Sequence, residues 1–419
     1  MKVLISHPTS NEFNRAAALG LLEANQLLRF HTAIANFPGT FLDRLSELKS
    51  LAELKRRSFS ASLQPHTHTF PWLEAGRQLS MKAGLRSLVQ HETGLFCVDA
   101  VYRSLDKKVA SGLAEAKAQG ATAVYAYLDG AVYSFREAKM LGLSCLYDLP
   151  IGYWRTAKRM LSAEQDRWPL WASTMTGLMD SEEKLARQDE ELMLADHVIV
   201  ASRFTANTLE DYPGKLPVVS IVPYGFPVVN DKIKNAAVYT GNRKLKLLFV
   251  GGLSQRKGIA DVFEAVKGLE NYVELTIVGL KSGPGCSALD QALSQHTWIP
   301  SLPHQQVLEL MREHDALLFP SLFEGFGLVI TEAMSQGIPV ITTERTAGPD
   351  LITHGEDGWL INAGDTQQLK DAITALLSRP QDVAAAGRAA RECARKRPWD
   401  VYKTELVAAL NRPLDAKRN

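Results

Sequence analysis

The stretch 316–343 limits the possible folds of this chain more than any other part of its sequence. Residues 316–319 are all apolar, as expected for a buried strand of a parallel sheet. A loop that ends in Glu-Gly-Phe-Gly at 324–327 follows, and residues 328–336 have a helical pattern. Gly and Pro end that helix, and a second apolar run begins at 339–341. The stretch therefore predicts a strand–loop–helix–strand unit of the α/β class, with a glycine-rich loop at the helix start.

The loop between this strand and this helix has the features of an anion-binding site. The first N–H groups of a helix have no partners inside it, and the helix dipole is positive there. Gly325 and Gly327 lack a Cβ, so the backbone can come close to a phosphate. Glu324 and Glu332 frame the loop, and a carboxylate accepts hydrogen bonds from two neighbouring sugar hydroxyls. The pattern indicates a nucleotide-sugar; a helix with a polar start and a surface glutamate is the alternative.

The rest of the chain has an ordinary globular composition, with 46% hydrophobic and 22% charged residues among 419. This length exceeds what one core usually supports, so two domains are expected. The formal net charge of +1 gives no general attraction to nucleic acid, and no nucleic-acid partner is expected. The four cysteines are far apart and include no CxxC pair, which is typical of reduced thiols in the cytoplasm.

Two α/β series separated by a polar segment predict the domain boundaries. Residues 1–226 form the first series, and residues 227–243 lack clear periodicity, as is typical of a linker. Residues 244–397 form the second series, in which 347–352, the turn 356–358 and the strand 359–361 are expected to complete the sheet. The tail 398–419 predicts a helix that packs back on the first domain. Two Rossmann-like, doubly wound parallel sheets would then face each other across a cleft.

Polar residues that follow the strands of the first domain are candidates for an acceptor side, because ligands of doubly wound sheets lie beyond the carboxyl ends of the strands. Those near the predicted strands 1–6, 121–127 and 144–149 are His7, Asn14, Arg15, Asp129 and Tyr153. A polar loop with an ordinary cap explains the first three equally well. For Tyr153, stacking on a sugar ring and simple packing are about equally good explanations.

Residues 41–58 are amphipathic and basic. Leucine recurs every three residues from Leu42 to Leu54, and Lys49, Lys55, Arg56 and Arg57 add basic charge. Such a segment can lie on an anionic membrane surface, which would give the first domain a peripheral membrane contact. A helix whose apolar side faces the core is the alternative, and it is the interpretation we favour.

The second series begins with another glycine-rich loop. Residues 251–258, GGLSQRKG, follow the predicted strand 245–250 and precede the predicted helix 259–266. The loop carries two adjacent cations, Arg256 and Lys257, and adjacent Arg and Lys suit the charges of a diphosphate. A solvated turn is the alternative.

Together these residues resemble a known enzyme family. EGFGLVITEAMSQGIPVITT resembles the EX7E signature of the retaining glycosyltransferases of the GT-B fold, glycosyltransferase family 4, with Glu324 and Glu332 as its two acids. GGLSQRKGI resembles the phosphate loop of that family, usually written G-R-L-x-x-x-K-G. The similarity is close over residues 245–365 and loose over the first half of the chain.

The resemblance implies roles for the matching residues. Lys257 would neutralise the donor diphosphate, Glu332 would hold the ribose hydroxyls, and Glu324 would contact the transferred sugar near its reacting carbon. The remaining donor-binding positions are in the same two loops: Gly251, Gly252, Gly325, and the N–H groups of Phe326, Gly327 and Leu328.

This chain also departs from the family pattern. The family usually has Arg where this chain has Gly252, so Arg256 would compensate. A family histidine that follows a strand of the first domain has no clear match, and Pro150 occupies that region. The glycine pair of the family's first loop is replaced by Thr9-Ser10-Asn11. The departures concern mainly the acceptor side.

The resemblance implies retaining transfer from a nucleoside-diphosphate sugar, with UDP- or GDP-sugars as the expected donors and no further cofactor. The sequence has no Asp-x-Asp pair, which metal-dependent transferases of the other common fold use, so metal-independent transfer is expected. A glycan or lipid-linked acceptor is expected, in cell-surface polysaccharide synthesis in the cytoplasm or at the inner face of the plasma membrane. Two alternatives remain open: another enzyme of the same fold, such as a phosphorylase or a nucleotide-sugar epimerase, and a nucleotide-sugar-binding protein without activity.

Overall fold

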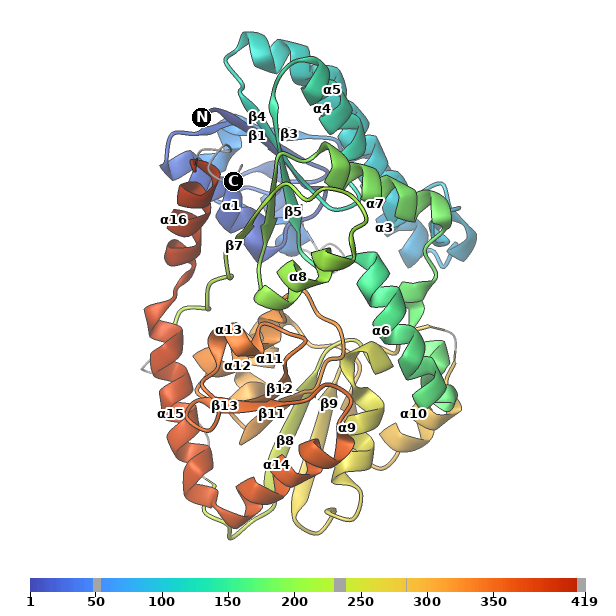
Figure 1. The fold of residues 1–419 in the computed structure, drawn as a ribbon, viewed down its shortest axis with the longest axis vertical. Coiled ribbons are helices and arrows are strands. Elements are labelled where there is room, and N and C mark those ends of the chain that lie inside the picture. Colours follow the sequence, from blue (N-terminus) through green and yellow to red (C-terminus); the bar gives the residue numbers. More distant parts are fainter. Residues whose placement is uncertain (48–53, 230–238, 284, 413–419) are drawn as a thin grey trace.

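The computed structural model describes residues 1–47, 54–229, 239–283 and 285–412. Across these residues the strands form two parallel sheets, one in the upper and one in the lower half of Figure 1. This arrangement confirms the predicted pair of Rossmann-like doubly wound sheets. The exact domain boundaries stay a prediction.

The first sheet, within the described residues, has seven strands in the order β3-β2-β1-β4-β5-β6-β7, and its neighbours all pair in parallel. Its central strands are short apolar runs that helices cover on both faces, which is why their residues are buried on both sides. The strands are β1 Val3–Ser6, β2 Leu27–Thr32, β3 Thr67–Thr69, β4 Ala123–Tyr127, β5 Ser144–Leu149, β6 His197–Val200 and β7 Val218–Ile221.

The second sheet has six strands in the described part of the chain, in the order β10-β9-β8-β11-β12-β13, again all parallel. β8 lies between β9 and β11, so the order of the strands reverses there, and the loops after β8 and β11 border the usual ligand crevice. The strands are β8 Leu245–Val250, β9 Val273–Val278, β10 Thr297–Ile299, β11 Ala316–Phe319, β12 Val340–Thr343 and β13 Gly358–Ile361.

Helices cover both faces of each sheet. In Figure 1, α1 and α16 lie on one side of the first sheet, and α4, α5 and α7 lie on the other. In the first half the helices are α1 Glu12–Glu23, α2 Phe41–Ser46, α3 Trp72–Lys82, α4 Val98–Ala118, α5 Val132–Met140, α6 Trp154–Arg167, α7 Glu182–Leu194 and α8 Arg203–Thr208. In the second half they are α9 Ile259–Val266, α10 Ser287–Leu293, α11 His304–Met311, α12 Leu328–Ser335, α13 Gly348–Leu351, α14 Thr366–Ser378, α15 Pro380–Lys396 and α16 Trp399–Leu410.

The last helix, α16, returns from the second sheet to the first (Figure 1). The chain crosses where the Phe226 N–H donates to the Arg397 carbonyl at 2.9 Å. A Cβ at Gly225 would lie 2.5 Å from Trp399 Cα, so this crossing requires glycine. Beyond it α16 packs on α1, where Lys403 Nζ lies 2.7 Å from Glu23. Two chain segments therefore connect the halves.

Two sequence expectations differ from the structure. Residues 347–352 do not add a strand: they contain the short helix α13, because Pro349 stands in its first turn and fixes a helical backbone there. Within the described residues of the segment 41–58, the only α-helix is α2. Phe41 and Leu42 of this helix are exposed, so the interpretation that its apolar side faces the core is wrong for these two residues. Lys49 lies outside the described residues.

No helix in the described part of the chain is both long and apolar enough to cross a membrane.

Candidate functional site

The glycine-rich loop 324–327 connects β11 to α12 at the carboxyl end of the sheet. Gly327 is the N-cap residue of α12 and has a left-handed backbone, with φ of 89°. A Cβ at Gly327 would lie 2.8 Å from the Phe319 ring, so the backbone and the space both require glycine. A glycine N-cap has no side chain to satisfy the N–H groups of the first turn. The start of α12 therefore retains donors of the kind that bind anions.

Arg256 and Lys257 approach the same loop from β8. They end the short 3-10 turn η7 (Gln255–Lys257), between β8 and α9. The Lys257 ammonium contacts the Glu324 carboxylate. The Arg256 guanidinium donates to the Phe323 carbonyl at 2.7 Å and lies 3.4 Å from Glu324 Oε2. The structure thus brings Arg256, Lys257 and Glu324 into one cluster, which we call the cation–Glu324 cluster.

Gly258 holds the two loops of this cluster together. Its φ is 71°, and a Cβ there would lie 2.1 Å from the Pro320 carbonyl oxygen. The Arg256 carbonyl also accepts from the Leu322 N–H at 2.9 Å and from the Ser321 hydroxyl at 3.2 Å. Because β8 and β11 are neighbours in the sheet, the loops that follow them lie edge to edge. The sequence feature behind the geometry is a glycine that follows the two cations.

Burial determines the electrostatics of the cation–Glu324 cluster. Burial lowers the pKa of Lys257 well below its ordinary value, and the charge of Arg256 lowers it further. Burial also lowers the pKa of Arg256. Two cations face one carboxylate, so the cluster has excess positive charge in a place where charge is poorly solvated. A bound diphosphate would offset that excess.

Glu332 lies in the body of α12 and has a different partner. Its carboxylate is 3.0 Å from His304 Nε2, at the start of α11. The hydrogen bond that His304 donates to Glu332 raises the pKa of His304 against the opposing effect of burial, and the charges of Glu332 and of Glu12 raise it further. Glu12 belongs to α1, so a charge from the first half acts on this pair. His304 was missed at the sequence level; the only signal was its place directly after Pro303, at a helix start.

The first half of the chain packs directly against the glycine-rich loop. A Cβ at Gly325 would lie 1.8 Å from the Pro150 carbonyl oxygen. The Gly325 carbonyl accepts from the Ser202 hydroxyl at 2.6 Å and from the Thr205 hydroxyl at 2.8 Å. Phe326 is buried, and its ring centroid is 4.8 Å from that of Tyr224. The close approach at Gly325 therefore involves Pro150, in the region where the family histidine is absent.

The loop after β8 has glycines of two kinds. The Gly251 carbonyl would lie 1.8 Å from a Cβ on Gly279, so these two backbones nearly touch. A Cβ at Gly252 would meet Ser282 Oγ at 3.5 Å, which is ordinary contact. A Cβ at Gly252 therefore fits without a clash.

His7, Asn14 and Arg15 all have partners inside the first half. His7 is buried, its Nδ1 lies 3.1 Å from the Thr9 N–H, and burial lowers its pKa to about 4. The Asn14 amide donates to the Thr9 carbonyl, and Arg15 pairs with Glu12 at 3.1 Å. These contacts order the loop after β1. Their role towards an acceptor stays a prediction.

Asp129 and Tyr153 are not brought to the cation–Glu324 cluster by any described contact; both connect to α7. Asp129 has a φ of 69°, accepts from Gln188 at 2.8 Å and lies 3.4 Å from Lys184. The Tyr153 hydroxyl donates to Asp189 at 2.6 Å. Their proposed acceptor roles are also untested.

The segment 154–174 of the first half reaches across to the second sheet. The Gln255 N–H donates to Thr174 Oγ1 at 3.0 Å, and the Gln255 amide donates to Glu164 at 3.2 Å. The rings of Trp171 and Phe263 stack with centroids 5.8 Å apart. Since Gln255 begins η7, this segment of the first half supports the turn that carries Arg256 and Lys257.

One group of three potential metal ligands lies together in the described residues, and it is separate from the donor loops. His91 Nε2 is 3.1 Å from Glu92 and 2.9 Å from Asp180, on the surface near the start of α7. Lys184 lies 3.0 Å from Asp180, which disfavours a cation there.

Comparison with known proteins places this geometry in context. Residues 231–393 match the family described as "Glycosyl transferases group 1". The amylovoran biosynthesis glycosyltransferase AmsK of Erwinia amylovora is 30% identical over 166 residues, which are 36% of this chain and 40% of that protein. The chain aligns with about half the length of the curated relatives it matches.

Solved structures resemble the whole chain. Sucrose-phosphate synthase from Thermosynechococcus elongatus has a TM-score of 0.65 and 16% identity, with 100% of both chains covered. Anabaena Alr3699/HepE, solved in complex with UDP, has a TM-score of 0.61 and 16% identity, with 98% of this chain and 99% of that chain covered. At these identities the likeness concerns the fold, and it confirms the predicted GT-B fold.

Proposed function

We propose that this chain, whose residues 231–393 belong to the glycosyl transferases group 1 family, is a retaining glycosyltransferase that moves a sugar from a nucleoside-diphosphate sugar without a metal ion. The observation that carries the proposal is the cation–Glu324 cluster at the uncapped start of α12. We further propose that the first sheet, residues 1–226, binds the acceptor and that residues 244–397 bind the donor.

The leaving diphosphate is the group that needs most stabilisation. As the bond from the anomeric carbon to the diphosphate breaks, negative charge develops on the diphosphate. Arg256, Lys257 and the N–H groups of Phe326, Gly327 and Leu328 are the donors proposed to meet that charge. Fixed donors in a site with little water stabilise a developing anion strongly, commonly by a factor of roughly 100–1,000 for each donor. These residues supply the electrostatic role that a divalent metal has in other transferases.

Transfer with retention requires the acceptor to attack on the face that the diphosphate leaves. The acceptor oxygen forms a bond to the anomeric carbon, the bond to the diphosphate breaks, and the acceptor proton passes to a donor phosphate oxygen. Glu324 therefore serves beside the reacting carbon without forming a covalent bond. Its contact with Lys257 holds it at the cluster until a donor enters.

A UDP- or GDP-sugar is the proposed donor. The HepE neighbour was solved with UDP, which supports testing UDP-sugars first. Glu332 is proposed to bind the ribose hydroxyls, and it would exchange its hydrogen bond with His304 for them. Because His304 is exposed, that exchange leaves no buried group without a partner.

The proposed acceptor is a glycan or a lipid-linked glycan for cell-surface polysaccharide, reached at the inner face of the plasma membrane. The AmsK relative is named as a glycosyltransferase of amylovoran biosynthesis. Large apolar side chains on α3 and at the start of α4 are exposed, among them Trp72, Leu79, Met81 and Val98. Such residues favour contact with a membrane or lipid. Binding to vesicles that contain anionic lipid tests this part, with Trp72→Ser as the variant.

The test of the function compares donor binding with transfer. Purified protein is screened by thermal shift with UDP-, GDP- and ADP-sugars, because saturating ligand raises the melting temperature. Glu324→Ala is expected to abolish transfer with modest loss of donor binding. Lys257→Met is expected to weaken donor binding as well, whereas Lys267→Met, at an exposed lysine on α9's C-terminal side, serves as the matched control.

The proposal fails if none of these nucleotide-sugars changes the melting temperature of the wild type. A Glu324→Ala protein with full transfer activity would remove Glu324 from the mechanism.

A further inference from the structure

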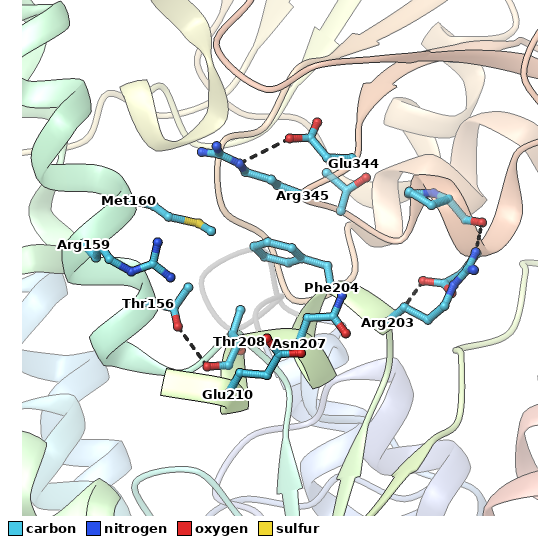
Figure 2. Close-up of a pocket in the computed structure, with 13 residues that line it drawn as sticks. Thr156, Arg159, Met160, Arg203, Phe204, Asn207, Thr208, Glu210, Glu344 and Arg345 are labelled. Atoms are coloured by element: carbon cyan, nitrogen blue, oxygen red, sulfur yellow. Dashed lines mark hydrogen bonds and ion pairs between the residues drawn. The ribbon is translucent and has the colours of Figure 1, made fainter. Parts of the chain in front are cut away.

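A hollow lies between the two halves, and none of the predicted donor residues lines it. Its volume is about 550 Å³, within the roughly 300–1,000 Å³ that is usual for small-molecule sites. Residues of α6 and α8 form one wall, and residues 344–350, which follow β12, form the other (Figure 2). A ligand here would contact both halves of the chain.

The charges that line this hollow cancel. Three of its side chains are arginines, and each is already paired with an acid. The pairs are Arg159 with Asp211 at 2.7 Å, Arg203 with Asp350 at 2.6 Å, and Arg345 with Glu344 at 3.4 Å. Of the residues that line the hollow, Glu210, Glu344 and Asp350 balance the three arginines in formal charge. The lining therefore has no net charge to attract an anion, but it places guanidinium donors beside carboxylate acceptors.

An apolar surface lies among these polar pairs. Phe204 is half-buried, and in Figure 2 its ring projects between Met160 and Arg345. The edge-to-face contact of Phe204 with Phe323, at 5.3 Å and 80°, fixes the orientation of its ring. Pro349 adds apolar surface from the opposite wall. The hollow thus combines an aromatic ring with paired donors and acceptors.

These features match the chemistry of an uncharged sugar. A pyranose ring has an apolar face of C–H groups, which packs on aromatic rings, and a rim of hydroxyls, each both a donor and an acceptor. A charged ligand would need an excess of one sign, and a wholly apolar ligand would leave the guanidinium and carboxylate groups without water or partners.

The hollow also shares a wall with the proposed catalytic loop. The Glu324 N–H donates to the Arg345 carbonyl at 3.1 Å. The Thr343 hydroxyl accepts from the Arg345 N–H at 3.2 Å, so the loop after β12 is itself ordered. A ligand that contacts Arg345 therefore acts on the segment that holds the backbone of Glu324.

We propose that this hollow is a binding site for non-reacting sugar units of a neutral acceptor glycan. The inference rests on the proposed function, because it assigns these sugars to the acceptor of the same transfer. Binding energy from units remote from the reacting group would then help to position the acceptor and to hold the two halves together.

The experiment measures binding of neutral tetrasaccharides to the full chain by calorimetry. The panel is maltotetraose, cellotetraose, chitotetraose and mannotetraose, with tetragalacturonic acid as the anionic comparison. Asn207→Trp fills the hollow from an exposed position on α8, and Arg159→Ala removes one guanidinium. Gln367→Trp, at an exposed position on α14, is the matched control. Thermal shift with the nucleotide-sugar donor is recorded for each variant.

At least one neutral tetrasaccharide is expected to bind the wild type, with affinity at least tenfold weaker in Asn207→Trp and reduced in Arg159→Ala. Gln367→Trp is expected to bind as the wild type does, and the donor shift is expected to stay unchanged in all three variants. The inference is overturned if no neutral tetrasaccharide binds, if only the anionic one binds, or if Asn207→Trp binds as tightly as the wild type. If the wild type binds a neutral tetrasaccharide but none of the nucleotide-sugars, the proposed function is overturned and the sugar site is supported.

Discussion

Asp148→Asn should stabilise the protein by an amount that grows with pH. Asp148 lies in β5 with only 2% of its surface exposed. The Tyr125 hydroxyl donates to its Oδ2 at 2.6 Å. Burial raises the pKa of Asp148 from 3.8 to about 7, against the opposing effect of that hydrogen bond. Ionising this carboxyl inside the first half therefore costs free energy that ionising it in the unfolded chain does not.

The sign and size of the effect follow from this shift. A carboxyl whose native pKa is raised favours the fold fully below its unfolded pKa, near pH 4, and this contribution is lost as pH rises to about 7. A shift from 3.8 to about 7 corresponds to about 4 kcal/mol, at about 1.4 kcal/mol per pKa unit. Burial also raises the pKa of Tyr125, Tyr127, Tyr224 and Tyr402, so these neighbours stay neutral over this range.

Urea unfolding of Asp148→Asn and the wild type at several pH values between 5 and 8 measures the effect. Asn keeps an oxygen for Tyr125 and cannot ionise. The variant's free energy of unfolding, relative to the wild type, should rise by about 2–3 kcal/mol from pH 5 to pH 8. Asp371→Asn, at an exposed position on α14, should show no such change. A difference that stays constant across this range would refute the reasoning.

Two further substitutions test the contacts of the proposed donor site. Gly325→Ala should lower the free energy of unfolding by roughly 1–3 kcal/mol, because its Cβ would meet the Pro150 carbonyl, and should therefore lower both the melting temperature and the transfer activity. Gly177→Ala, with open space around it, should change neither measurement. Glu332 raises the pKa of His304, so their ion pair is strongest below pH 6.5 and weakens as pH rises. Because this pair competes with the ribose for Glu332, the donor KM of the wild type should rise towards acidic pH, and His304→Ala should remove that rise. Equal KM profiles in the two proteins would contradict that role.

Local sequence signals predicted the elements that carry the site. The run Leu245–Val250 is predicted as a strand with the bounds that the structure has, because it is a short, mostly apolar run ended by glycine. The helix start after Gly327 was likewise visible, since glycine and apolar spacing are local features. Spacing also placed Arg256 and Lys257 directly before a helix.

Partners distant in the sequence could not be predicted in the same way. The contacts of Gly325 with Pro150 and Ser202, and of Glu332 with His304, depend on how the two halves meet. No periodicity in a single sequence indicates which loop of one half lies against which loop of the other. Asp129 and similar polar residues after strands were good candidates by position, yet the structure gives Asp129 an internal partner in Lys184.

Gly325 also shows which residues are informative about a ligand. The approach of Pro150 is sufficient to require glycine there, so a glycine at this position would be retained with or without a phosphate. The two cations are different, because burial lowers the pKa of Lys257 and of Arg256, and apolar residues of similar size would pack with less desolvation. The case for a diphosphate therefore depends on the cations more than on the glycines.

That distinction predicts opposite changes in stability and function for the double variant Lys257→Met, Glu324→Gln. The double change removes the Lys257 cation and the Glu324 carboxylate together, while Arg256 loses its contact with Glu324 and keeps its hydrogen bond to the Phe323 carbonyl. We expect a melting temperature equal to or above that of the wild type, with loss of donor-induced stabilisation and of transfer. A double variant that unfolds at much lower temperature would show that the pair serves the fold, and the electrostatic argument for a donor site would lose its main support.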